Sequence, residues 1–161
     1  MVMDLRVNFS DRNVLPAKKS IFLAGPTCFD TPFEQSWRRR AVNILNDFQY
    51  DGLVYVPEYQ MGLINSNKRE EQAYWEREAM DVAGVIVFWI PSGMKHYIGS
   101  YNAEFSRYLK IKAENVVYGH PKSVREVEYL DYIYDMEQSN GEIYRTLEDT
   151  LGRASYLGLF L

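Results

Sequence analysis

The chain has 161 residues, of which 47% are hydrophobic and 25% charged, and its formal net charge is −4. This length and composition are typical of one globular domain with a sizeable core, and they exclude a disordered chain. The acidic balance argues against a nucleic-acid polymer as partner, because a phosphate backbone requires a basic protein face. We therefore expect the partner to be a small molecule.

The amino-terminal residues and the cysteine content indicate the compartment. Cys28 is the only cysteine, so no disulfide can form within the chain, which is typical of a reducing compartment. Residues 1–20 are charged and lack an apolar stretch, so they do not resemble a signal peptide. The apolar run at residues 82–90 is far shorter than the ~20 residues that span a bilayer. We expect a soluble, cytoplasmic protein with no membrane partner.

Apolar periodicity divides most of the chain into alternating short strands and helices. Strands are predicted at residues 20–24, 53–56, 85–90 and 115–118, and helices at about 32–48, 71–82, 102–112, 124–136 and 143–154. The polar residues 1–19 are expected to form a tail or an edge strand. Gly25, Pro57 and Pro91 each follow a predicted strand directly and end its extended segment.

This alternation of strands and helices predicts the fold class. Short turns between the elements require right-handed crossovers and a parallel sheet with helices on both faces. We predict an α/β fold, namely a flavodoxin-like doubly wound parallel sheet of four to five strands with flanking helices. One domain is expected over residues 1–161. Sheets of this kind bind ligands at the carboxyl ends of their strands.

Two acidic residues are candidates for chemistry at that edge. Glu104 lies in the first turn of the helix after strand 85–90, where the helix terminus favours an ionised carboxylate. Glu76 lies on the helix that enters the same strand. Each has a structural alternative: Glu104 as a solvated helix residue, and Glu76 as a surface acid paired with Arg77 or Lys68.

The loop after strand 85–90 carries further polar candidates. Its glycines allow a ligand to approach closely, and Ser100 and Asn102 offer polar groups there. His96 lies in the same loop, where it could cover a ligand or contact a phosphate, or simply be solvated. His120 precedes Pro121 and is typical of a turn.

Metal and cofactor signatures are missing from the sequence. No pair of histidines or cysteines has the spacing of metal ligands, so no metal site is predicted. Neither a Walker loop nor a G-x-G-x-x-G motif follows any predicted strand. We therefore expect no cofactor.

Six short motifs occur in a characteristic order over about residues 20–120. They are Ile21–Thr27, Ser36–Arg38, Val56-Pro57, Trp75-Glu76, Val87–Pro91 and Tyr101–Glu104. Each motif is weak alone, but the ordered set resembles the nucleoside 2-deoxyribosyltransferase-like family. It is closest to the branch with Leu-Ala-Gly-Pro after the first family strand and Phe-Trp in the third.

The resemblance implies roles for individual residues. It places Glu104 at the position of the nucleophile and Glu76 at that of the acid, usually aspartate, that handles the departing base. It also implies that the turn formed by Gly25, Pro26 and Thr27 lines the sugar and base pocket.

Three positions depart from the family pattern. Glutamate at position 76 adds one methylene to the usual aspartate, and Gly84 replaces a second aspartate. Phe105 replaces a glycine that often follows the nucleophile, and is expected to reshape the pocket floor.

The implied reaction is N-glycosidic bond cleavage or transfer on a (deoxy)nucleoside or its 5′-monophosphate. The sequence leaves open whether the acceptor is a base, as in a transferase, or water, as in a hydrolase. Arg38, His96 and Ser100 are candidate phosphate or sugar contacts, and Asn102 is a further substrate contact.

Two other functions stay open. One is a non-catalytic nucleotide-binding module on the same fold, which the three departures favour. The other is a structural or partner-binding α/β domain, which would fit the tyrosine-rich residues 129–144. That segment is expected instead to pack a homodimer.

Overall fold

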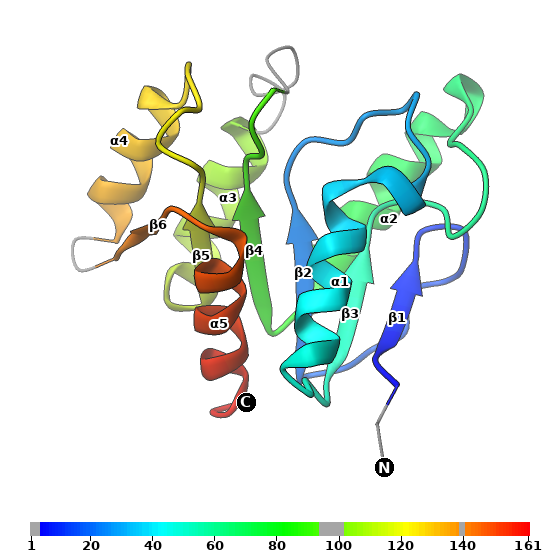
Figure 1. Cartoon of the computed structure of the whole chain (residues 1–161), viewed down its shortest axis with the longest axis horizontal. Coiled ribbons are helices and arrows are strands. Elements are labelled where there is room, and N and C mark those ends of the chain that lie inside the picture. Colours follow the sequence, from blue (N-terminus) through cyan, green and yellow to red (C-terminus); the bar gives the residue numbers. More distant parts are fainter. Residues whose placement is uncertain (1–3, 94–101, 139–140) are drawn as a thin grey trace.

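The fold is built on a parallel β-sheet (Figure 1). The structure, a computed structural model, describes residues 4–93, 102–138 and 141–161. In these residues six strands take the order β1-β3-β2-β4-β5-β6, and every neighbouring pair is parallel. The strands are β1 (Arg6–Phe9), β2 (Ser20–Ala24), β3 (Leu53–Val56), β4 (Val85–Trp89), β5 (Val116–Gly119) and β6 (Ile143–Tyr144).

Helices cover both faces of the sheet (Figure 1). They are α1 (Trp37–Asp47), α2 (Arg69–Val82), α3 (Asn102–Lys112), α4 (Glu128–Glu137) and α5 (Leu147–Gly158), with short 3-10 turns at Phe33–Gln35, Ser66–Lys68 and Ala113–Asn115. Side chains of α1 and α5 pack on one face, together with Ile21 and Leu23 of β2. Those of α2, α3 and α4 pack on the other face, with Phe22 and Ala24. The alternation along β2 thus supplies two cores.

Burial on both faces explains why the sequence predicts the central strands. Every residue of β2, β3, β4 and β5 is buried, so each strand is a continuous apolar run rather than an alternating one. The predicted bounds of β2 and β3 are confirmed without a shift. The α/β flavodoxin-like fold class is also confirmed.

The number of strands is higher than the four to five predicted. Residues 6–9 form β1 at one edge, which confirms the edge-strand alternative for the amino-terminal segment. The second addition is β6, only two residues long, at the other edge. The helix predicted at 143–154 wrongly includes these two residues. In the structure Thr146 caps α5 by accepting a hydrogen bond from the amide of Asp149, so the helix begins later.

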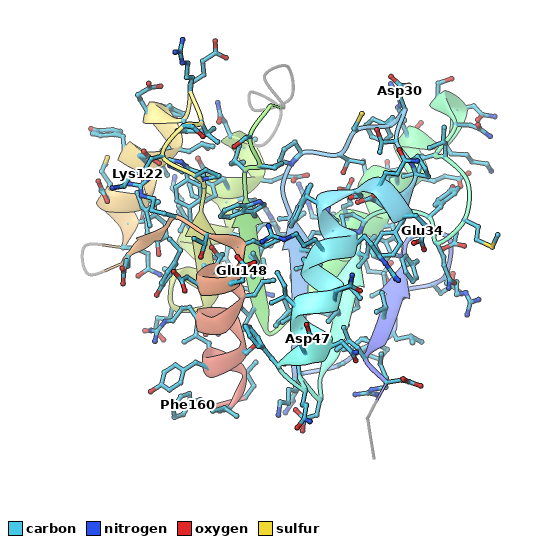
Figure 2. The ribbon with its side chains drawn as sticks, in the orientation of Figure 1. Asp30, Glu34, Asp47, Lys122, Glu148 and Phe160 are labelled. Carbon is cyan, nitrogen blue, oxygen red and sulfur yellow. The ribbon has the colours of Figure 1, made fainter. Side chains whose placement is uncertain are left out.

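The chain reverses its direction across the sheet between β2 and β4. From β2 it crosses to β3 on one side, and after β4 it continues to β5 on the other side. The carboxyl ends of β2 and β4 therefore border a topological switch point, where open α/β sheets bind ligands. Asp30, labelled in Figure 2, lies near this carboxyl edge, whereas Phe160 lies at the opposite edge.

Two contacts fix helices around that edge. An ion pair of Arg40 with Glu148, which is labelled in Figure 2, joins α1 to the start of α5. His120 directly precedes the turn closed by the amide of Val124 and the carbonyl of Pro121; it is buried, and its Nε2 lies 2.9 Å from Oδ1 of Asp131 on α4. Among the described residues no helix has the length and apolar content needed to cross a membrane.

Candidate active site

Three helices near the switch point between β2 and β4 carry ionisable side chains that act on one another. Arg38 comes from the first turn of α1, Glu76 from the middle of α2 and Glu104 from the first turn of α3. Their charges act on one another, because Glu104 raises the pKa of Glu76 and Arg38 lowers it. The fold therefore brings together an acid pair and a cation that are distant in sequence.

Glu76 is an acid held in a poorly solvated place. Burial is the largest cause that raises its pKa, and the neighbouring charge of Glu104 raises it further, to about 8. The preceding residue, Trp75, is buried in the core and its indole N–H donates to the carbonyl of Arg12 at 2.7 Å. This bond fixes the turn of α2 that bears Glu76.

Lys68 does not form the surface ion pair with Glu76 that the sequence left open. Lys68 pairs with Glu71, with 3.4 Å between Nζ and Oε1. Arg77, the other expected partner, acts on Glu104, whose pKa it lowers. In the described part of the chain, neither Glu76 nor Glu104 has a hydrogen bond or an ion pair within 4.0 Å.

Glu104 is also shifted by its surroundings. Burial is the larger effect and raises its pKa, and Arg77 opposes this. The net direction is upward, and the ionised state that the helix terminus favours stays a prediction for this carboxyl. The cost of removing this carboxylate from water therefore exceeds the favourable effect of the Arg77 charge.

Two departures from the family pattern have structural explanations. Phe105 packs in the core, with ring centroids 4.9 Å from both Phe88 and Tyr118, so it does not form a pocket floor. Gly84 lies where a Cβ atom would meet the carbonyl oxygen of Lys18 at 2.2 Å. An aspartate at position 84 would therefore require the backbone to move.

The turn after β2 lies against the end of β4 at the switch point. Gly25 has φ +142°, and a Cβ atom there would meet the carbonyl oxygen of Trp89 at 2.2 Å. Only glycine lets the end of β2 approach the end of β4 this closely. The indole N–H of Trp37 donates to the carbonyl of Pro26 at 3.0 Å and holds the turn from α1.

Arg38 binds the same turn from within the protein. Its side chain has no exposed surface, and its Nε and Nη2 donate to the carbonyls of Leu23 and Gly25 at 2.8 and 2.7 Å. Its Nη1 donates to Thr27 Oγ1 at 2.8 Å and to Glu58 Oε2 at 2.9 Å. The guanidinium thus fastens both ends of the turn.

Glu58 completes this cluster and was not found from the sequence. It follows β3 directly after Pro57, is 5% exposed, and also accepts a hydrogen bond of 2.6 Å from Ser36 Oγ. An acid immediately after a buried strand was the only available signal, because its partner Arg38 lies 20 residues earlier.

The remaining predicted site residues divide into two groups. Asn102 begins α3, two residues before Glu104, and its Oδ1 is buried without a hydrogen-bond partner among the described residues. His96 and Ser100 lie outside the described residues. Within residues 4–93, 102–138 and 141–161 no cluster of three or more His, Cys, Asp or Glu side chains could hold a metal ion.

The model of a family described as nucleoside 2-deoxyribosyltransferase like matches residues 18–122, well over half of the chain. The chain belongs to this family. The matched span runs from just before β2 to just after β5 and contains Arg38, Glu58, Glu76 and Glu104. No curated protein matches the chain.

Proposed function

We propose that the protein cleaves the N-glycosidic bond of a (deoxy)nucleoside or a nucleoside 5′-monophosphate and passes the sugar to a second base or to water. The observation that carries the proposal is a pair of half-buried, unpaired acids, in which desolvation and the charge of Glu104 raise the pKa of Glu76 to about 8. Because two close carboxyl groups resist ionising together, one can hold a proton at neutral pH while the other is charged. Cleavage of this bond requires one of each.

In the proposed first step, a carboxylate oxygen of Glu104 attacks C1′ of the sugar. The C1′–N bond breaks, its electron pair goes to the departing base, and Glu76 donates its proton to that base. The products are the free base, a glycosyl ester on Glu104 and ionised Glu76. In the transition state the charge of Glu104 stabilises the positive charge that develops on the sugar ring.

In the second step, Glu76 accepts a proton from the acceptor, which attacks C1′ and releases Glu104. Two inversions return the original configuration at C1′. If the acceptor is a base the enzyme is a transferase, and if it is water the enzyme is a hydrolase.

Substrate contacts are assigned to the turn and to the start of α3. The backbone of Gly25, Pro26 and Thr27 lines the sugar and base, and the unpartnered Oδ1 of Asn102 accepts a hydrogen bond from a sugar hydroxyl. His96 and Ser100 are the proposed phosphate or sugar contacts. Arg38 reaches the substrate indirectly, through the turn that it fastens.

The test is a substrate panel with two readouts. Deoxynucleosides, ribonucleosides and their 5′-monophosphates are incubated with the protein, with and without a second free base, and products are separated by liquid chromatography. We expect exchange of bases or release of free base. A 2-deoxy-2-fluoro nucleoside, whose second step is slow, should leave a glycosyl adduct on the peptide that contains Glu104. No product across the panel and no adduct would overturn the proposal.

A binding module without catalysis is the second candidate. The observation that favours it is Gly84, where the backbone leaves no room for the usual aspartate. A nucleotide that raises the melting temperature but gives neither product nor adduct would support this alternative.

We also propose that the protein acts in the cytoplasm as a homodimer formed through α4. Tyr129, Tyr132 and Met136 follow helical i, i+3, i+7 spacing and are 58%, 62% and 64% exposed. An apolar stripe of this kind is costly in water and suits an interface. Light scattering at micromolar concentration should give the dimer mass, and Tyr132→Glu should give the monomer. A monomeric wild type would contradict the proposal.

A further inference from the structure

The ion pair of Arg38 and Glu58 is buried against the end of β2, next to the turn of the proposed site. The side chains of the two residues are 0% and 6% exposed, so neither is available to a substrate in this structure. A buried ion pair costs desolvation energy that its Coulomb attraction often fails to recover. Its presence at the switch point therefore calls for a role other than stability.

The first part of that role is geometric. Arg38 makes hydrogen bonds of 2.7–2.9 Å to Leu23, Gly25, Thr27 and Glu58, which use its Nε, Nη1 and Nη2 in a planar fork. Glu58 orients this fork, and Ser36 orients Glu58 through a hydrogen bond of 2.6 Å. The position of the turn thus depends on Glu58, although Glu58 is not bonded to the turn directly.

The second part is electrostatic. The charged groups that act on Glu76 are Glu104 from α3 and Arg38 from α1, with opposite signs. The carboxylate of Glu58, 2.9 Å from Nη1 of Arg38, offsets the guanidinium charge. Without Glu58, the full cation would favour the ionised form of Glu76, which cannot donate a proton.

We propose that Glu58 is a positioning residue for the reaction: it anchors Arg38, and through it the turn at residues 25–27, and it balances the guanidinium charge that faces Glu76. This inference rests on the proposed function for its consequence in catalysis. Its structural content, the effect of the pair on Glu76, can be measured without turnover.

The experiment compares two variants that change the charge near Glu76 in opposite directions. Glu58→Gln keeps an amide oxygen that can accept from Arg38 and Ser36, but leaves the guanidinium charge unbalanced. The double variant Arg38→Gln/Glu58→Gln removes both charges, so no uncompensated ion is buried and the protein is spared that cost of folding. Carbon-13 NMR of the glutamate carboxyl groups follows the titration of Glu76, which is assigned by its loss in Glu76→Gln.

The expected results differ in sign. In Glu58→Gln the midpoint of the Glu76 titration should move to lower pH, by about half a unit to one unit, and in the double variant to higher pH. The alkaline limb of kcat should move with it. In the double variant KM should also rise, because the turn loses its hydrogen bonds from the Arg38 guanidinium.

A matched control is the exposed ion pair of Arg39 with Glu34, in which Nε lies 3.5 Å from Oε2. Glu34→Gln also leaves an arginine of α1 without its partner, but the Glu76 titration and both kinetic constants should stay unchanged. An unmoved titration in both test variants would overturn the inference, and so would unfolding of both, since the pair would then be structural only. Shifts of the expected sign without any turnover would uphold it and refute the proposed enzyme instead.

Discussion

Two clusters of buried and half-buried polar groups lie at the carboxyl edge of the sheet, and they differ in how completely they are paired. After β5, the hydroxyl of Tyr118 donates to Oδ1 of Asp131 at 2.8 Å, and the ring nitrogens of His120 lie 2.9 Å from Asp131 Oδ1 and 2.8 Å from the Pro121 carbonyl. At the switch point, by contrast, Glu76 and Glu104 have no hydrogen bond or ion pair within the described residues.

This difference separates structure from function. Burying a polar group without a partner costs folding free energy, so most buried polar groups are paired, as in the cluster of Tyr118, His120 and Asp131. An acid that stays unpaired in a poorly solvated place, as Glu76 does, is a candidate for a functional role. Variants of the two clusters should therefore behave oppositely: activity depends on the acids at the switch point, and stability on the pairs after β5.

The largest effect is expected from Glu104→Gln. The amide keeps the size of the side chain but cannot attack C1′, so turnover should fall by at least about 1,000-fold. Base release from the best substrate of the panel measures this loss.

The matched control for that variant is Glu78→Gln on α2. Glu78 is exposed on the helix that bears Glu76, so the same substitution there should leave the rate unchanged. If Glu104→Gln retains more than a tenth of wild-type activity, Glu104 is not the nucleophile.

A somewhat smaller loss is expected from Glu76→Gln, and it should depend on the leaving group. Without the proton donor, cleavage of a nucleoside should slow by about 100- to 1,000-fold. A deoxyribosyl compound with a nitrophenolate leaving group needs no proton and should be cleaved at nearly the wild-type rate. Equal losses on both substrates would contradict the role of general acid.

The pH dependence of wild-type activity on nucleosides should also report the pKa of Glu76. The rate should fall above about pH 8, where Glu76 loses its proton, and fall again at low pH as Glu104 gains one. In Glu76→Gln the alkaline limb should disappear, while the acid limb remains.

Glu76→Gln, which should lower activity, is predicted to raise the free energy of unfolding. The pKa of Glu76 is about 8 in the folded protein and 4.5 for an ordinary glutamate, so the folded state binds this proton more tightly than the unfolded chain does. Wild-type stability should therefore decline as pH rises from about 4.5 to 8. Glu76→Gln removes that decline and should be more stable near pH 7 by up to about 3 kcal/mol, as measured by urea unfolding. A variant that is less stable than wild type at pH 7 would show that Glu76 is paired.

Local sequence patterns predict the central strands and the two acids, but not the paired cluster after β5. Strands β2 and β3 were predicted to the residue, because burial on both faces leaves unbroken apolar runs that end at Gly25 and Pro57. The two acids are predicted as site residues because helix position and family motifs both indicate them.

What escaped prediction depends on contacts between distant residues. Glu58 and Arg38 are 20 residues apart, and His120 and Asp131 belong to a loop and a helix whose packing no local pattern encodes. Strand β6 was missed because a two-residue strand has no periodicity, and it gains its hydrogen bonds only from β5.

The smallest effect is expected from Tyr118→Phe in the paired cluster. The variant removes one hydroxyl, whose bond to Asp131 should contribute about 1 kcal/mol, so Tm should fall by about 2–4 °C. The loss stays small because Asp131 keeps the imidazole of His120 at 2.9 Å.

The control is Tyr74→Phe on α2, where the hydroxyl belongs to a side chain that is 70% exposed and its removal should cost nothing measurable. Activity should be unchanged in both variants, since neither touches the acids. A loss of turnover in Tyr118→Phe at full stability would place the cluster after β5 within the catalytic machinery, and the contrast between a paired, structural region and an unpaired, chemical one would fail.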